Sequence, residues 1–361
     1  MQKIIFCGGG SGGHVLPALT LIQKIKQQSN DVEILYIGGF KSIEKELVQA
    51  QNISYRAIHT GKLRRYLSLE NLKDMLNVVR GFFDALFILK RENKSNSLIV
   101  FSTGGFVSVP VVLAARLLRI PIFIHEQTSR VGLANKIASR FANKIFISFK
   151  ASANYFPSHK VIYSGYPLRD ECYDQKIRHP HFKNIDLQTP AKPILFVTGG
   201  GNGAKLINDF IARNLSTLAQ HFTIIHQVGK SFIDQFEPLA SNDYLPCAFV
   251  GPEMIDLFKA SKIVLSRSGA GTVCELLALQ KPSIFIPLKI AQKNEQYHNA
   301  KEAQLQLSSV IVEEDQMLDD QILLNAILNF NSQKIFSSEI TSDSNEKASE
   351  LILKYLSQFR S

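Results

Sequence analysis

The sequence predicts an α/β fold of two units, each built around a parallel β-sheet. The chain has 361 residues, whereas compact domains usually hold about 100–200. Short runs rich in Val and Ile alternate with helix-length amphipathic stretches along it, which is the pattern of repeated βαβ units. A strand, a glycine-rich turn and a helix start occur twice, at 3–17 and at 193–204. A Rossmann-type unit begins in this way, so two such units are expected.

The expected strands are apolar runs without polar alternation, which is typical of strands covered on both faces. In the first unit they cover 3–7, 33–37, 98–102, 122–125, 144–148 and 161–163. In the second they cover 193–198, 222–227, 248–250, 263–265, 283–286 and 309–312. The polar tract 175–193 has the composition of a loop or linker, so the boundary is expected between 165 and 192. A last helix is expected at 348–359.

The charge is uneven along the chain. The net charge is +10, with 41 Lys and Arg against 31 Asp and Glu. Residues 1–165 carry a net +13 and residues 166–361 a net −3. A basic half indicates an anionic partner: nucleic acid, a lipid surface or a phosphorylated substrate. Neither an aromatic-rich basic ribbon nor a helix-turn-helix signal is present, so nucleic acid is not expected.

The cysteines and apolar stretches indicate in which cellular compartment the protein is expected. The four cysteines lack CxxC spacing, which excludes a recognisable zinc site or disulfide framework and fits a reducing compartment. The apolar start is too short for a signal sequence, and the apolar stretch 107–124 is interrupted by two prolines and two arginines. We expect a cytoplasmic protein, soluble or attached to a membrane face.

The first glycine-rich turn fits GxGxxG through Gly8, Gly10 and Gly13, which indicates phosphate binding at the start of a helix. A nicotinamide cofactor would require an acidic residue at the end of the second strand, but that strand ends in Gly38-Gly39. No P-loop motif is present either. His14 follows the turn, either as a capping or packing residue or as a general base or phosphate ligand.

Two further turns carry small residues. Gly104-Gly105 follows the third expected strand, as a second anion site or a plain βα turn. The segment 267–275 places Glu275 in the first turns of a helix. There it is either an ordinary solvated residue or a carboxylate for a ribose diol beside a helix end that faces a diphosphate. No metal-ligand spacing is present, so helix dipoles and cations such as Arg169 would stabilise a diphosphate leaving group.

Residues 62–91 combine helical apolar spacing with flanking Lys and Arg. One interpretation is a core-facing helix with a solvated basic side. The other is a partly exposed apolar face that docks on anionic lipid. The residues that would then contact the membrane are Leu72, Met75, Val79, Phe82, Phe83 and Phe87.

These motifs together resemble the MurG family, the peripheral glycosyltransferases that add N-acetylglucosamine to lipid I in bacterial peptidoglycan synthesis. The matching segments are GGGSGGHVLPAL (8–19), STGGFVSVPVVLAA (102–115), HEQTSRVGLANKIA (125–138), SGYPLR (164–169), VTGGGNGAKLIN (197–208), SRSGAGTVCELLA (266–278), PSIFIPL (282–288) and EQYHNA (295–300). The resemblance implies a GT-B fold, with two Rossmann-like domains facing across a cleft. It implies an acceptor and membrane-facing domain at 1–164, a UDP-sugar donor domain at 165–340, and a segment 341–361 whose helix packs back toward the first domain.

The resemblance also implies roles for individual residues. His14 would be the base that deprotonates the acceptor C4 hydroxyl, with Glu126 as the alternative. The acceptor pyrophosphate would lie on Gly9, Gly10, Gly104 and Gly105. The donor, UDP-N-acetylglucosamine, would contact Ser11, Gly12, Gly13, Thr128, Arg169, Gly201, Val250, Ala270, Gly271, Thr272, Val273, Cys274, Glu275, Gln296 and Asn299. No metal or other cofactor is expected.

Two positions depart from the family pattern, which commonly has Asn at Thr128 and Ser-Gln at Gly201-Asn202. The implied reaction is a single inverting displacement that forms a β-1,4 bond at the cytoplasmic face of the membrane. Lipid I, an anionic membrane surface and cell-wall or division proteins are the implied partners. Two alternatives are a GT-B enzyme acting on another lipid, such as a diacylglycerol, and a non-catalytic nucleotide-sugar binding module.

Overall fold

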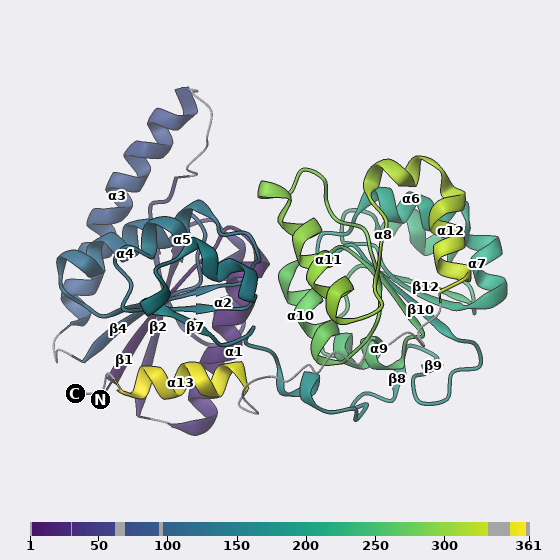
Figure 1. Cartoon of the computed structure of the whole chain (residues 1–361), viewed down its shortest axis with the longest axis horizontal. Helices are drawn as coiled ribbons and strands as arrows, with labels where there is room; N and C mark the ends of the chain where they lie inside the picture. Colours follow the sequence, from purple (N-terminus) through teal and green to yellow (C-terminus); the bar gives the residue numbers. More distant parts are fainter. Residues whose placement is uncertain (1, 30, 62–68, 94–96, 331–346, 359–361) are drawn as a thin grey trace. The chain divides into compact units, whose positions relative to one another are not determined.

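A computed structural model describes residues 2–29, 31–61, 69–93, 97–330 and 347–358, without the side chains of 2, 69–73, 292 and 318. Contacts between Cα atoms divide the chain into two compact units (Figure 1). Unit 1 comprises Met1–Leu168 and Ser342–Ser361, and unit 2 comprises Arg169–Thr341. Each has a parallel sheet with helices on its faces, as the sequence predicted.

Unit 1 has a seven-stranded sheet in the order β3-β2-β1-β4-β5-β6-β7, in which every pair is parallel. Its strands are β1 Gln2–Cys7, β2 Val32–Gly39, β3 Ser54–Ile58, β4 Leu98–Ser102, β5 Ile122–Glu126, β6 Lys144–Ile147 and β7 Val161–Tyr163. Its helices are α1 Gly12–Gln28, α2 Ile43–Gln49, α3 Leu69–Glu92, α4 Ser108–Leu117, α5 Leu133–Ala138 and α13 Ala348–Gln358, with 3-10 turns η1 Lys150–Tyr155 and η2 Ser158–Lys160.

Alternate residues of each strand fill two separate cores, because successive side chains of a strand point to opposite faces of the sheet. Ile5 and Cys7 of β1 belong to a core completed by α3, α4 and α5. Ile4 and Phe6 belong to a core completed by α1, α2 and α13. Both faces are therefore covered, which explains the continuous apolar runs in the sequence.

Unit 2 has a six-stranded parallel sheet in the order β12-β11-β10-β13-β14-β15. Its strands are β10 Ile194–Thr198, β11 Thr223–Gln227, β12 Tyr244–Cys247, β13 Ile263–Ser266, β14 Ile284–Phe285 and β15 Val310–Ile311. Its helices are α6 Lys205–Arg213, α7 Leu215–His221, α8 Ile233–Phe236, α9 Met254–Ala260, α10 Ala270–Ala278, α11 Glu295–Gln306 and α12 Asp320–Leu328, with 3-10 turns η3 Asp170–Tyr173, η4 Glu237–Leu239, η5 Gln292–Asn294 and η6 Glu314–Leu318.

The structure corrects three expectations about strands. β3, an edge strand whose burial alternates, was not predicted. The expected strand at 248–250 is instead β12, four residues earlier, where Pro246 lies in an edge strand, the position in a sheet that tolerates proline. The tract 175–193, expected as a linker, holds a small antiparallel hairpin of β8 His181–Phe182 and β9 Ile185–Asp186.

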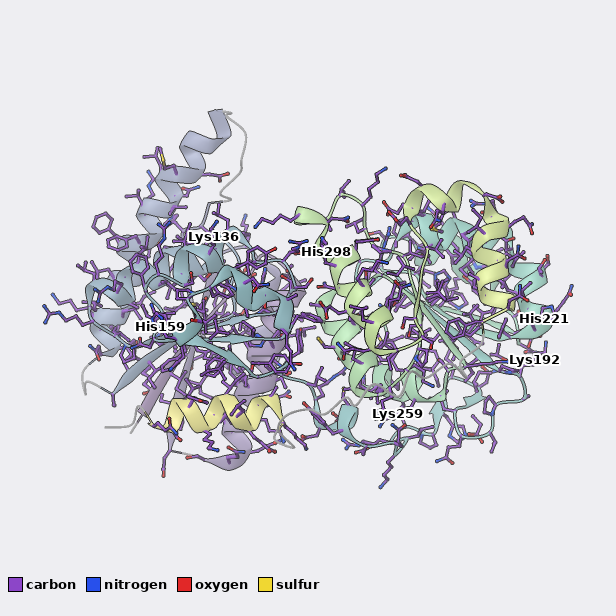
Figure 2. All side chains as sticks on the ribbon, in the orientation of Figure 1. Lys136, His159, Lys192, His221, Lys259 and His298 are labelled. Atoms are coloured by element: carbon purple, nitrogen blue, oxygen red, sulfur yellow. The ribbon has the colours of Figure 1, made fainter. Side chains whose placement is uncertain are left out.

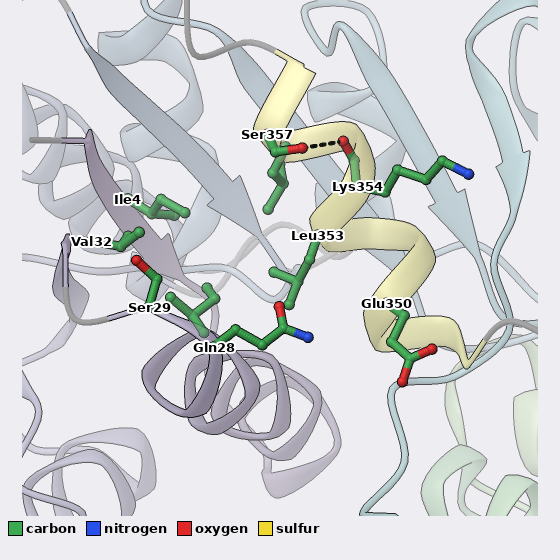
Figure 3. A pocket seen from close by; sticks show the side chains of 10 residues that line it. Ile4, Gln28, Ser29, Val32, Glu350, Leu353, Lys354 and Ser357 are labelled. Atoms are coloured by element: carbon green, nitrogen blue, oxygen red, sulfur yellow. Dashed lines mark hydrogen bonds between the residues drawn. The ribbon is translucent and has the colours of Figure 1, made fainter.

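Helix α13 packs on the α1 side of unit 1. Ile352 and Leu356 are buried in that core, and the Tyr355 ring lies edge-on to Phe146 at 5.9 Å. A pocket of about 450 Å³ remains between α13, the end of α1 and the starts of β1 and β2 (Figure 3). The glycine-rich turns follow the other ends of the strands, so this pocket is separate from them.

The segment that follows Arg169 is fixed to unit 2 by a buried carboxylate. Asp256 of α9 is 2% exposed and accepts hydrogen bonds from the N–H of Arg178 (3.0 Å), the N–H of His179 (2.9 Å) and the His179 ring (2.8 Å). Lys259 of the same helix, labelled in Figure 2, donates to Asp174 at 3.0 Å. Burial alone would raise the pKa of Asp256, but these hydrogen bonds lower it below its usual value.

We expect Asp256→Asn to lower the free energy of unfolding by about 1–3 kcal/mol at pH 7, because it removes the charge from a buried, hydrogen-bonded acceptor. The folded pKa is below the unfolded one, so this stabilisation is complete above about pH 4 and is lost as pH falls through the folded pKa. Urea unfolding followed by circular dichroism measures both effects. Asp209→Asn, at a carboxylate whose side chain is 41% exposed in an ion pair with Lys205, is the control, and equal stability of the two variants at pH 7 would contradict the role of Asp256.

Candidate active site

Three loops of unit 1 meet where β1, β4 and β5, which are neighbours in the sheet, end. They are the glycine-rich turn before α1, the Thr103–Gly105 turn before α4, and the residues after β5. The N–H of Thr103 donates to the carbonyl of Cys7 (2.9 Å), and the N–H of Gly9 donates to the carbonyl of Gly104 (3.2 Å). The first two turns are therefore joined backbone to backbone.

This close approach requires glycine. Gly105 has a φ of +81°, and a β-carbon there would clash with the carbonyl oxygen of Gly9. Gly10 has a φ of +89°, and a β-carbon there would press on the ring of Phe106. Side chains are thus excluded from both turns.

The backbone donors of these turns are largely used inside the chain. The N–H of Gly10 donates to the buried carboxylate of Glu44 (3.3 Å), and that of Gly104 donates to the hydroxyl of Ser102 (3.2 Å). The N–H groups of Gly12 and Gly13, in the first turn of α1, have no acceptor among the described residues. The predicted pyrophosphate role of Gly9, Gly10, Gly104 and Gly105 stays a prediction, in which Gly9, Gly10 and Gly104 contribute shape rather than N–H donors.

His14 lies in the first turn of α1, partly exposed, beside the Thr103 turn. Its Nδ1 is 3.0 Å from the carbonyl oxygen of Thr103 and 3.2 Å from Oε1 of Gln127. Both atoms only accept hydrogen bonds, so Nδ1 carries the proton and the neutral ring has its lone pair on Nε2. A histidine held in this state can accept a proton from a hydroxyl group.

Glu126, the alternative base, is 2% exposed at the end of β5. Its carboxylate accepts from the N–H (3.0 Å) and hydroxyl (2.9 Å) of Thr128 and from the side-chain amide of Asn135 (3.0 Å). Burial raises its pKa, against these hydrogen bonds and the nearby His14. The carboxylate is enclosed by its partners, whereas Nε2 of His14 has no hydrogen-bond partner among the described residues. The geometry therefore favours His14 as the base.

In unit 2, the start of α10 presents unused backbone donors. Gly269 precedes the helix without a side-chain cap, and the first helical N–H to find a backbone acceptor is that of Val273, which donates to Gly269 at 3.0 Å. The N–H groups of Ala270, Gly271 and Thr272 have no acceptor among the described residues. A diphosphate at this helix start would meet three N–H donors and the positive end of the helix dipole.

Glu275 and Arg169 form an ion pair beside this helix start. Nη2 of Arg169 is 2.9 Å from Oε1 of Glu275, whose side chain is 18% exposed. Burial raises the pKa of Glu275, and the guanidinium opposes that shift. Oε2 of Glu275 has no hydrogen-bond partner in the described part of the chain. It remains able to accept from a ribose hydroxyl.

The other predicted donor contacts of this region differ in accessibility. Val273 and Cys274 belong to α10 itself, and their side chains are buried. Asn299 is 1% exposed and donates to the carbonyl of Ser268 (3.2 Å), so it shapes the loop before α10. Gln296 is half-buried, and its Oε1 accepts from the N–H of Leu288 (3.0 Å). Of these four, Gln296 retains an amide that can face a sugar.

Gly201 and Val250 lie near the ends of β10 and β12. The N–H of Val250 donates to Oε1 of Gln227 (2.7 Å), which leaves its carbonyl for a base. Gly201 is exposed, and a β-carbon there would reach van der Waals contact with the ring of Phe249, which is 59% exposed. An exposed ring at this place offers a stacking surface that the sequence analysis missed.

Helix α3 carries an exposed apolar stripe. Met75, Val79, Phe83 and Phe87 recur every four residues and are 49–71% exposed, and one end of the helix projects beyond the rest of unit 1 (Figure 1). Phe82, expected with them, is instead half-buried against the core, while the side chain of Leu72 lies outside the described residues. None of the described helices combines the length and apolar content needed to cross a bilayer.

Four residues that support the site were also missed. Glu44 accepts from the N–H groups of Gly10 and Gly39, and Tyr36 donates to the carbonyl of Gly8 (2.9 Å). Gln127 donates to the carbonyl of His125 in β5, and Gln227 donates to the carbonyl of Gly200 in the turn after β10. The only sequence signal that could have identified the two glutamines is their position at the end of a strand. Gln127 directly follows β5, and Gln227 is the last residue of β11. No group of three or more His, Cys, Asp or Glu suited to a metal ion occurs among the described residues.

Comparison with known proteins agrees with this architecture. The glycosyltransferase family 28 N-terminal domain matches residues 4–147 and the family's C-terminal domain matches 194–355. A relative from Lachnoclostridium phytofermentans is 37% identical (100% of this chain, 99% of its own), and one from Clostridium novyi is 38% identical (98% of each). Both are named UDP-N-acetylglucosamine--N-acetylmuramyl-(pentapeptide) pyrophosphoryl-undecaprenol N-acetylglucosamine transferase.

Solved structures show the same fold. MurG from Acinetobacter baumannii superposes with a TM-score of 0.73 at 24% identity, covering 99% of this chain and 100% of that one. UDP-GlcNAc 2-epimerase from Neisseria meningitidis has a TM-score of 0.63 at 16% identity, covering 99% and 100%. The resemblance that the motifs predicted is confirmed, and the chain belongs to glycosyltransferase family 28.

Proposed function

We propose that this chain transfers N-acetylglucosamine from UDP-N-acetylglucosamine to the C4 hydroxyl of the N-acetylmuramoyl residue of lipid I, forming lipid II. The observation that carries the proposal is the full-length likeness to relatives bearing that name, at 37–38% identity. The partly exposed His14, with its free Nε2, and the unused donors at the start of α10 support it. The enzyme is a glycosyltransferase.

In the proposed reaction the acceptor oxygen forms a bond to the anomeric carbon while the bond from that carbon to the diphosphate breaks. The proton of the C4 hydroxyl goes to Nε2 of His14, and UDP leaves. The N–H groups of Ala270, Gly271 and Thr272 stabilise the charge that develops on the diphosphate. Glu275 holds the ribose and Gln296 contacts the sugar. Attack opposite the leaving group inverts the anomeric centre and gives a β bond.

We expect His14→Ala to lower kcat by about 10²–10⁴-fold, because a general base contributes an acceleration of that size. KM for the donor should change little. Steady-state transfer of labelled N-acetylglucosamine to lipid I measures both constants. The exposed His221→Ala in unit 2 is a matched control. Near-normal turnover of His14→Ala would overturn the base assignment and return Glu126 as the candidate.

We expect Glu275→Gln to weaken UDP binding about tenfold, because the amide removes the charge from a hydrogen-bonding carboxylate paired with Arg169. Isothermal titration of UDP gives the dissociation constant directly. The control is Glu237→Gln, an exposed change in the same unit. Unaltered UDP affinity in Glu275→Gln would remove Glu275 from the donor site.

We also propose that α3 attaches the enzyme to the anionic cytoplasmic face of the membrane. The stripe Met75, Val79, Phe83 and Phe87 would enter the lipid, and Arg80, Lys90 and Arg91 of the same helix would face the headgroups. Helix α4 packs against α3, and its Leu117 is also exposed, at 62%.

The double change Phe83→Ser and Phe87→Ser should abolish most binding to vesicles that contain anionic lipid, because both rings are exposed and carry little of the core packing. Vesicle sedimentation measures binding, and circular dichroism checks the fold. The control is Leu239→Ser with Leu305→Ser, two exposed apolar positions of unit 2. Intact vesicle binding by the α3 variant would show that the helix is not the docking element.

A further inference from the structure

Gln127 lies between two histidines of unit 1. It follows β5 directly and is 1% exposed. Its Oε1 is 3.2 Å from Nδ1 of His14. Its Nε2 is 3.2 Å from Nδ1 of His125 and 3.0 Å from the carbonyl oxygen of His125. One buried amide therefore joins the two rings.

Two backbone carbonyls fix the protons between Gln127 and His14. The carbonyl of His125 can only accept, so the atom of Gln127 that faces it is the amide nitrogen, and Oε1 must face His14. The carbonyl of Thr103 can also only accept, so Nδ1 of His14 carries its proton toward both acceptors. The lone pair of His14 is left on Nε2.

His125 completes the arrangement. The ring is fully buried, its Nε2 is 3.1 Å from the carbonyl oxygen of Gly165, and Ser148 Oγ is 3.3 Å away. Burial lowers the pKa of His125 to about 4, so the ring is neutral near pH 7. With its proton on Nε2 toward Gly165, its Nδ1 accepts the second amide hydrogen of Gln127.

We propose that Gln127 is a positioning residue for the transfer reaction, which holds His14 with Nδ1 protonated and Nε2 free, and that His125 in turn holds the amide of Gln127. This inference rests on the proposed function. Glu126, the carboxyl that also faces His14, is engaged by Thr128 and Asn135 and does not contact the ring through a hydrogen bond. The orientation of His14 therefore depends on Gln127 and on the Thr103 carbonyl.

The first test is Gln127→Met, which keeps the length of the side chain and removes the amide. We expect kcat for transfer to lipid I to fall about 10- to 100-fold, as for a misplaced reacting group, with KM for donor and acceptor within about twofold. Gln23→Met, an exposed change on α1, is the matched control. An unchanged kcat, or a raised KM at constant kcat, overturns the proposal, because the latter would make Gln127 a substrate contact.

A second variant covers the outcome in which Gln127→Met does not fold. Gln127→Glu keeps an oxygen that accepts from Nδ1 of His14 and adds a negative charge, which favours the protonated ring and raises its pKa. The acidic limb of the kcat profile should move to higher pH, with activity retained on the alkaline side. An unmoved limb overturns the proposal.

The third readout does not depend on activity. Long-range proton–nitrogen NMR spectra of the full chain labelled with ¹⁵N-histidine report which ring nitrogen carries the proton, and His14→Gln identifies the His14 signals. We expect Nδ1–H in the wild type and a mixture of tautomers in Gln127→Met. Nε2–H in the wild type overturns the proposal. If the spectra agree while wild-type enzyme transfers no sugar to lipid I, the positioning stands and the proposed function fails.

Discussion

The contact between the backbones of Gly9 and Gly105 is the constraint on which the candidate site of unit 1 depends. It joins the turn after β1 to the turn after β4, and no side chain fits between them. Because the turns are joined, the start of α1 is held against Thr103, and His14 finds its acceptor there. The β5 end adds Gln127 and Glu126 from the neighbouring strand. A parallel sheet with adjacent carboxyl ends is what allows three distant segments to build one site.

The two units have similar arrangements at the ends of their strands. In each, a glycine-rich turn precedes a helix and a buried glutamine lies near the end of a strand: Gln127 bonds the carbonyl of His125 in β5, and Gln227 bonds the carbonyl of Gly200 in the turn after β10. A glutamine suits both positions because one side chain supplies a donor and an acceptor: Gln127 uses them toward β5 and His14, and Gln227 toward Gly200 and Val250. The near-neutral charge of unit 2 is compatible with the proposed binding of an anionic nucleotide sugar, because the hydrogen-bond donors at the start of α10 are backbone N–H groups. A count of Lys and Arg cannot detect them.

Much of the fold follows from the sequence, since strands covered on both faces give continuous apolar runs. β3 was missed because it is an edge strand with alternating burial. The strand β12 was predicted four residues too far along the chain because it contains Pro246, a residue that argues against a strand. At the candidate site, the places of His14 and Glu275 at the starts of helices after small-residue turns follow from the sequence, while their roles stay predictions. The engagement of Gly10 by Glu44, 34 residues away, could not, because it depends on how α2 packs. The same holds for Phe82 and Phe83, neighbours on α3 of which one faces the core and the other solvent.

The most direct test of the proposed activity is a transfer assay with the full chain, purified lipid I and UDP-N-acetylglucosamine labelled in the sugar. The account predicts that the label enters the lipid fraction in a β-1,4 linkage, with one UDP released per sugar transferred. Release of UDP without label in the lipid, or transfer to a diacylglycerol while lipid I stays inert, would contradict it.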